Sequence, residues 1–83
     1  MDSCMITFRS VTPAQRGEIA LRREGIACSV QRTPRMLAEK GCGYSIRLRC
    51  GYLRQAVELL RQKGIVYQKT YTLRDGNPDE VSV

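Results

Sequence analysis

The chain has 83 residues, which is the size of one small domain. Its apolar fraction of 42% and its charged fraction of 27% are typical of a globular protein with a modest core. The absence of histidine excludes Ser-His-Asp triads, Cys-His dyads and metal sites built on imidazole. The net charge of +6 favours anionic partners. The sequence shows neither a long apolar run nor a secretory signal pattern, so we expect a cytoplasmic protein without membrane association.

A strand followed by a helix is predicted in the first part of the chain. Residues 4–9 alternate between apolar and polar side chains, as expected of a half-buried strand. Thr12 is a candidate helix N-cap, with Pro13 at the first helical position and Gln15 completing a capping box. We expect this helix to end just before Gly25, which supplies a left-handed stop.

The rest of the chain repeats this order after a second strand and a loop. A helix is indicated by the apolar spacing of Leu53, Ala56, Val57 and Leu60, and Gly64 closes it. The other expected elements are a strand at 26–31, a long loop at 32–43, and strands at 44–49 and 65–73.

Two similar strand-helix-strand units therefore follow one another. Both helices end in Gly-Ile, at Gly25 and at Gly64. Two such units predict an α+β fold, the ferredoxin-like β-α-β-β-α-β two-layer sandwich, with two helices on one face of an antiparallel sheet. We expect one domain at residues 1–73 and a disordered tail at 74–83, because the tail combines Gly, Pro and acidic residues without periodicity.

The four cysteines contain no CxxC pair, and in a reducing compartment we expect free thiols and no disulfide framework. Cys4, Cys28 and Cys50 share the parity of the apolar residues in their strands, which indicates buried small side chains. Cys42 differs because it lies in the loop between Gly41 and Gly43. We expect neither a metal site nor a cofactor.

Basic residues surround Cys42 along the sequence, and they include Arg35, Lys40 and Arg47. Positive charge and backbone amides stabilise a thiolate and lower the pKa of a cysteine. Two interpretations follow: Cys42 is a reactive thiol, or the glycines form a tight turn in which it is an ordinary small residue. Pro34 would hold the start of the loop rigid, and Arg35 would supply a fixed cation.

The order of Thr33-Pro34-Arg35, a short loop, Gly41-Cys42-Gly43 and two helices ending in Gly-Ile resembles the selenium/sulfur carrier-like family over roughly residues 5–73. The resemblance implies a single cysteine, Cys42, that holds sulfur or selenium as a persulfide-like group. It also implies partner proteins that donate and accept the chalcogen. We expect a carrier or binding protein rather than a turnover enzyme, with Gly41, Gly43, Pro34, Arg35, Lys40 and Arg47 supporting the thiolate.

Other interpretations remain open. A basic sheet face of Thr7, Arg9, Arg47 and Arg49 predicts weak phosphate binding, so the alternative is a small nucleic-acid-binding or protein-interaction module. Base-specific binding would need aromatic residues at those positions. A metallochaperone would need a second loop cysteine. A further interpretation is a homodimer formed by pairing at a sheet edge, for which the strand at residues 67–71 is the candidate.

Overall fold

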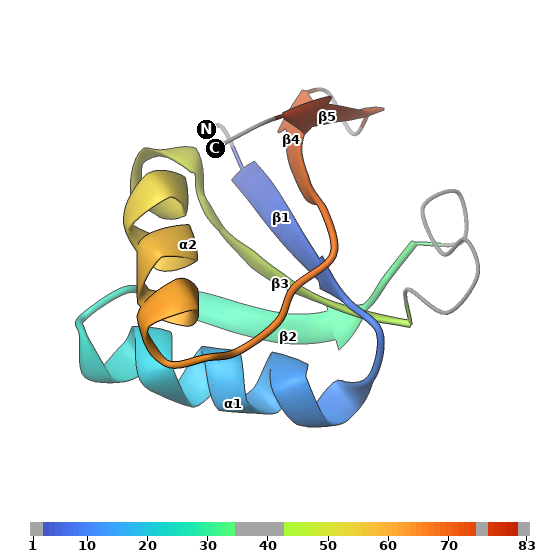
Figure 1. Cartoon of the computed structure of the whole chain (residues 1–83). Helices are drawn as coiled ribbons and strands as arrows, with labels where there is room; N and C mark the ends of the chain where they lie inside the picture. Colours follow the sequence, from blue (N-terminus) through green and yellow to red (C-terminus); the bar gives the residue numbers. More distant parts are fainter. Residues whose placement is uncertain (1–2, 35–42, 75–76, 82–83) are drawn as a thin grey trace.

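The computed structural model describes residues 3–34, 43–74 and 77–81. Within these ranges the chain forms two layers, one made of a single sheet and the other of two α-helices (Figure 1). The elements in chain order are β1 (Ser3–Phe8), α1 (Val11–Arg23), β2 (Cys28–Arg32), β3 (Tyr44–Arg49), the short 3-10 helix η2 (Cys50–Tyr52), α2 (Leu53–Gln62), β4 (Thr70–Arg74) and β5 (Asn77–Val81).

The described strands form a five-stranded sheet in the order β2-β3-β1-β4-β5, and every neighbouring pair is antiparallel. β1 and β2 flank β3, whereas β3 and β4 flank β1, so the two strand-helix-strand units interleave. The predicted α+β class is therefore confirmed. The order differs from that of the predicted four-stranded ferredoxin-like sandwich because β5 extends the sheet.

β5 lies in the segment where the sequence predicts a disordered tail. Arg74 and Asn77 are register partners, so only Asp75-Gly76 joins β4 to β5. Pairing with β4 accounts for the difference from the predicted tail, because the NPDEV sequence of β5 has little strand propensity of its own. The hydroxyl of Thr70 also donates a hydrogen bond to the carbonyl of Val81, which attaches the end of β5 to β4.

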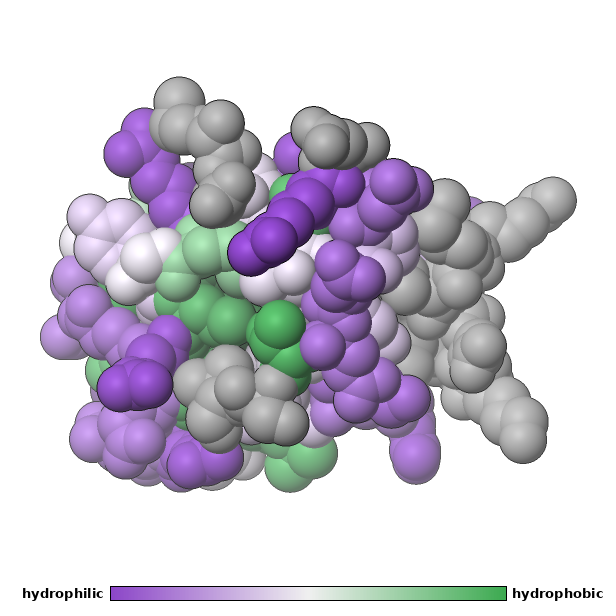
Figure 2. Space-filling model, turned by 90° about the horizontal axis from the view of Figure 1, so that it is seen from above, coloured by the Kyte–Doolittle hydropathy of each residue, from purple (hydrophilic) through white to green (hydrophobic). Residues whose placement is uncertain are grey.

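The core fills the space between the helices and one face of the sheet. Alternate residues of β1 face the helices, where Ile6 and Phe8 are fully buried. Gly17 of α1 allows this close packing, because a Cβ there would lie 3.0 Å from Ile46 and 3.1 Å from Leu60. At one end of the sandwich an apolar strip reaches the surface between hydrophilic residues (Figure 2).

Both helices end in the same way, as their matching Gly-Ile sequences suggest. Gly25 and Gly64 have positive φ angles of 81° and 70°, which glycine adopts without strain. The following residues, Ile26 and Ile65, donate backbone hydrogen bonds to Leu21 and Leu60, five residues back. This is a Schellman motif, and the buried isoleucine packs under the helix end.

Several predicted boundaries are wrong. α1 begins at Val11 with Ser10 as its N-cap, and not with a capping box at Thr12. β2 spans Cys28–Arg32 and not 26–31, because Ile26 completes the C-terminal stop of α1. β4 begins at Thr70 and not at residue 65, although the amide of Gln68 and the carbonyl of Lys69 still bond to the backbone of Thr7. β4 lies between β1 and β5, so its Thr70–Tyr71 part is not the predicted sheet edge.

Candidate functional site

The base of the segment that contains Cys42 is closed by the hairpin of β2 and β3. Arg32 and Tyr44 are register partners at the ends of these strands. One residue further out, the amide of Thr33 donates a hydrogen bond to the carbonyl of Gly43, with a nitrogen-oxygen distance of 3.1 Å. The two ends of this segment are therefore held together by one backbone hydrogen bond, between Thr33 and Gly43. Of the predicted site residues, Arg35, Lys40, Gly41 and Cys42 lie outside the described residues.

The other predicted site residues fall at two different places. Pro34 and Gly43 lie at the base, and both are half-buried. Arg47 lies within β3, four residues beyond Gly43 and exposed. At about 3.3 Å per strand residue, roughly 13 Å separates the backbones of these two residues. The described residues thus bring Pro34 and Gly43 together but place Arg47 further along the strand.

Two buried hydroxyls lie near this base, and sequence reasoning named Thr33 only as part of the Thr33-Pro34-Arg35 motif and did not identify Ser45. Thr33 follows β2, and Ser45 is the second residue of β3. Both side chains are buried, and neither hydroxyl oxygen has a hydrogen-bond partner in the part of the chain that the structure describes. Leaving a buried hydroxyl without a partner costs about 1–3 kcal/mol. The Thr33-Pro34-Arg35 motif was a sequence signal for Thr33, whereas nothing distinguishes Ser45 from an ordinary strand residue.

Cys4 and Cys50 form a disulfide bond, which corrects the prediction that all four cysteines are free thiols. Cys4 pairs in register with Leu48, and the chain turns into η2 two residues later. This turn brings the two Cα atoms to 4.9 Å, a separation suited to a disulfide. The sequence separation of 46 between the two cysteines hides the pairing, because only the strand register reveals it.

Cys28 lies on β2 beneath α1 and is a buried free thiol, as predicted. Its Sγ donates a weak hydrogen bond to the carbonyl of Glu18 at 3.9 Å. Burial raises the pKa of the Cys28 thiol, and the Glu18 carboxylate raises it further, against a smaller opposing effect of Arg22. This thiol is therefore held protonated and poorly nucleophilic at neutral pH.

The same helix side chains bind the outer edge of β2. The Glu18 carboxylate accepts a hydrogen bond from the amide of Val30 at 3.1 Å. The Arg22 guanidinium donates two bonds to the carbonyl of Cys28, at 3.2 and 2.8 Å. Glu18 and Arg22 also form an ion pair at 3.5 Å. Two polar backbone groups of this edge strand are thus already bonded.

The predicted basic sheet face is only half formed. Arg47 and Arg49 are exposed on β3. Thr7 is fully buried, however, and its hydroxyl bonds to the backbone of Lys69. Arg9 follows β1 and lies beside the start of α1 rather than on the sheet. A continuous phosphate-binding surface across the central strands is therefore not present among these residues.

The described ranges contain no helix long and apolar enough to cross a membrane. They also contain no group of three or more His, Cys, Asp or Glu residues that could hold a metal ion.

Comparison with known proteins gives one match. The family model described as "Putative Se/S carrier protein-like" matches residues 3–72, which is most of the chain. The match includes both helices, four of the strands in full or in large part, and the base of the segment with Cys42. Neither a search of curated proteins nor a search of solved structures finds a match.

Proposed function

The chain belongs to the Se/S carrier protein-like family, and from this premise we propose that Cys42 is the residue that carries the chalcogen. The observation that supports this assignment is the state of the other three cysteines. Cys4 and Cys50 are joined in a disulfide, and Cys28 is buried beneath α1 with a raised pKa. Of the four cysteines in the sequence, Cys42 is the one that these contacts do not occupy.

The proposed transfer is an exchange of one sulfur atom. The Cys42 thiolate attacks the outer sulfur of a persulfide on a donor. The sulfur-sulfur bond of the donor breaks and leaves the donor as a thiolate, while a new sulfur-sulfur bond forms on Cys42. The same step in reverse delivers the sulfur to an acceptor, so no external oxidant or reductant is consumed. Selenium transfers by the same exchange.

The surroundings of the segment suit an anionic sulfur group. Arg32, at the end of β2, is exposed and one residue from the closing hydrogen bond of the base. The buried hydroxyls of Thr33 and Ser45 have no hydrogen-bond partner among residues 3–34, 43–74 and 77–81. A persulfide anion accepts such bonds, and a nearby guanidinium lowers the pKa of the thiol that forms it. We propose that Arg35 and Lys40 add to this positive charge.

The experiment that tests this function measures sulfur uptake at each cysteine. The full chain is incubated with a low-molecular-weight persulfide, and peptides are weighed by mass spectrometry after blocking of the thiols. We expect the Cys42 peptide to gain the mass of one sulfur atom and the Cys28 peptide to gain none. Alkylation of Cys42 should also proceed at a pH well below the pKa of an ordinary cysteine thiol.

Two variants serve as controls. Cys42→Ser should abolish sulfur uptake by the protein, whereas Cys28→Ala should leave uptake unchanged. The carrier function is excluded if wild-type Cys42 reacts no faster than a free thiol and acquires no sulfur. Uptake that persists in Cys42→Ser would reject the assignment of the residue.

A further inference from the structure

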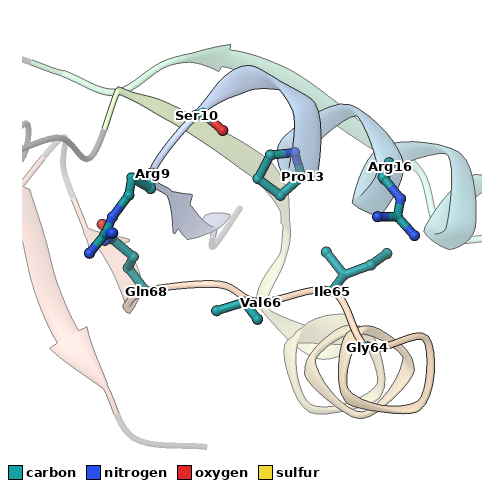
Figure 3. Close-up of a pocket in the computed structure, with 8 residues that line it drawn as sticks. All are labelled: Arg9, Ser10, Pro13, Arg16, Gly64, Ile65, Val66 and Gln68. Atoms are coloured by element: carbon teal, nitrogen blue, oxygen red, sulfur yellow. The ribbon is translucent and has the colours of Figure 1, made fainter.

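A pocket of about 480 Å³ lies between the start of α1 and the segment that joins α2 to β4. Its volume falls within the range of sites that hold small molecules. Figure 3 shows Arg9 and Arg16 on opposite sides of this pocket, with Pro13, Ile65 and Val66 between them. The pocket thus has an apolar middle and a guanidinium group at each end.

The apolar middle contains an unusually exposed residue. Val66 has 79% of its surface exposed, the highest fraction among the large apolar side chains that the structure describes. Its neighbour Ile65 is buried, and Pro13 faces them from the first turn of α1. An apolar ligand segment placed here would remove the Val66 side chain from water, which is favourable in proportion to the area covered.

The positive charges of Arg9 and Arg16 at the two ends of the pocket are not balanced by acidic residues among those that the structure describes around it. No acidic residue lines the pocket, and neither Arg9 nor Arg16 takes part in an ion pair within the described ranges. The first turn of α1 contains no acidic residue, and the hydroxyl of Ser10 makes no capping hydrogen bond. The positive end of the helix dipole therefore adds to the charge of the two guanidinium groups.

We propose that this pocket binds a small organic dianion whose negative groups lie at the two ends of an apolar chain. Each guanidinium can pair with one carboxylate through two parallel hydrogen bonds. The six steps from Ser10, the N-cap that follows Arg9, to Arg16 advance by roughly 9 Å along the helix axis, which sets the scale of the ligand. A linear aliphatic dicarboxylate such as adipate has this shape and is the probe of choice.

The pocket adjoins the segment of the proposed carrier residue at one described point. A Cβ on Gly43 would lie 3.9 Å from the carbonyl oxygen of Arg9, and Gly43 is bonded to Cys42. Binding of a dianion does not depend on the reactivity of Cys42, so the two proposals can fail separately. A protein that takes up sulfur but binds no dianion would overturn this inference alone.

The first test compares three ligands on the full wild-type chain by calorimetry and by amide chemical shifts. Adipate carries two charges, hexanoate carries one, and adipamide carries none. We expect adipate to bind about tenfold more tightly than hexanoate, because it forms a second charge-assisted pair. We expect adipamide to bind more weakly than either acid. The amide signals of Gly64 and Val66 should shift. Equal affinities for adipate and hexanoate would overturn the proposal.

The second test removes one charge at a time. Arg9→Gln and Arg16→Gln should each reduce the affinity for adipate about tenfold, to the level of hexanoate. Arg23→Gln is the matched control, because it removes the same charge from the last turn of α1, outside the pocket. An equal loss in Arg23→Gln would mean general attraction to a basic protein and would contradict the site.

Discussion

The raised pKa of Cys28 makes the stability of the protein depend on pH. In the unfolded chain this thiol ionises near its ordinary pKa of 9.0, whereas in the folded chain burial and the Glu18 carboxylate keep it protonated. Above that pH the folded state therefore binds more protons than the unfolded state. By linkage, the contribution of Cys28 to stability is fully present below pH 9.0 and is lost as the pH rises through the folded pKa.

We therefore predict that the free energy of unfolding falls above pH 9.0 and that part of this fall depends on Cys28. Urea unfolding at several pH values on both sides of 9.0 measures this fall in the free energy of unfolding. Cys28→Ala should flatten the profile, because the other titrating groups are the same in both proteins. Glu18→Gln should lower the pKa of the thiol. If the free energy of unfolding falls with pH at the same rate in Cys28→Ala and in the wild type, the pKa of Cys28 is not raised in the folded protein.

The residues differ in how far their roles could be predicted from sequence. The burial of Cys28 follows from strand parity, which is a local property. Its partners Glu18 and Arg22 lie on α1, ten and six positions earlier, and only the packing of the helix on β2 identifies them. The hydroxyl of Ser45, which has no hydrogen-bond partner among the described residues, has no local signature either, since Ser is common on strands.

The position of α1 depends on one glycine. Gly17 faces Ile46 on β3 and Leu60 on α2, and both would be within about 3 Å of an added Cβ. Well-packed cores accommodate additional carbon atoms only by moving side chains or backbone. The helix therefore lies as close to the sheet and to α2 as a residue without a side chain permits.

We predict that Gly17→Val lowers the free energy of unfolding by about 1–3 kcal/mol, because its branched side chain would overpack the interface. Urea denaturation monitored by circular dichroism gives the value. Gly51→Val is the control, since a Cβ at Gly51 has no other atom within 4 Å. A loss in Gly51→Val as large as that in Gly17→Val would indicate a backbone effect instead of crowding.

At the level of elements, the sequence predicts what is local and misses what depends on pairing. The glycine stops of both helices follow from short patterns, and the structure contains them. The alternation in β1 predicted a half-buried strand, and this is wrong, because Met5 and Thr7 are buried as well as Ile6 and Phe8. The helix start moved from Thr12 to Ser10 because the position of the chain after β1 decides which residue caps the helix. β5 was missed because its NPDEV sequence has little strand propensity, and β4 stabilises it by pairing.

The disulfide joins the beginning of the chain to the segment that leads into α2. Cys4 belongs to β1 at the centre of the sheet, and Cys50 belongs to η2. A covalent link across 46 residues restricts the unfolded chain far more than the folded one. The chain-entropy estimate for a loop of this length is about 4 kcal/mol. For a domain this small, such a contribution is a large part of the total stability.

We predict that Cys4→Ala combined with Cys50→Ala reduces the free energy of unfolding by about 2–4 kcal/mol. The measurement is urea unfolding with and without a reductant that reduces the disulfide once the chain is unfolded. The reductant should destabilise the wild type and should not affect the double variant. If the reductant leaves the wild type unchanged as well, the disulfide does not stabilise the protein. Cys28→Ala controls for the loss of a buried thiol.

For the molecule as a whole, the succession of two strand-helix-strand units predicted the α+β class, but the sheet order and the disulfide needed the register of distant strands. The assignment of Cys42 came from the glycines and basic residues around it, together with the likeness to a family. The pocket between Arg9 and Arg16 was not predicted, because it forms where two connections far apart in the sequence meet. Neither connection carries a motif that reveals the other.

The bonds from Glu18 and Arg22 to β2 bear on how this protein behaves when many copies are crowded together. A bare outer strand can template growth by adding strands from other chains, which leads to aggregates. Here an incoming strand would meet an amide of Val30 and a carbonyl of Cys28 that are already bonded. On the opposite side, β5 presents Pro78, which lacks an N–H, followed by two acidic residues. Both margins of the sheet thus carry features that disfavour the addition of a strand from another chain.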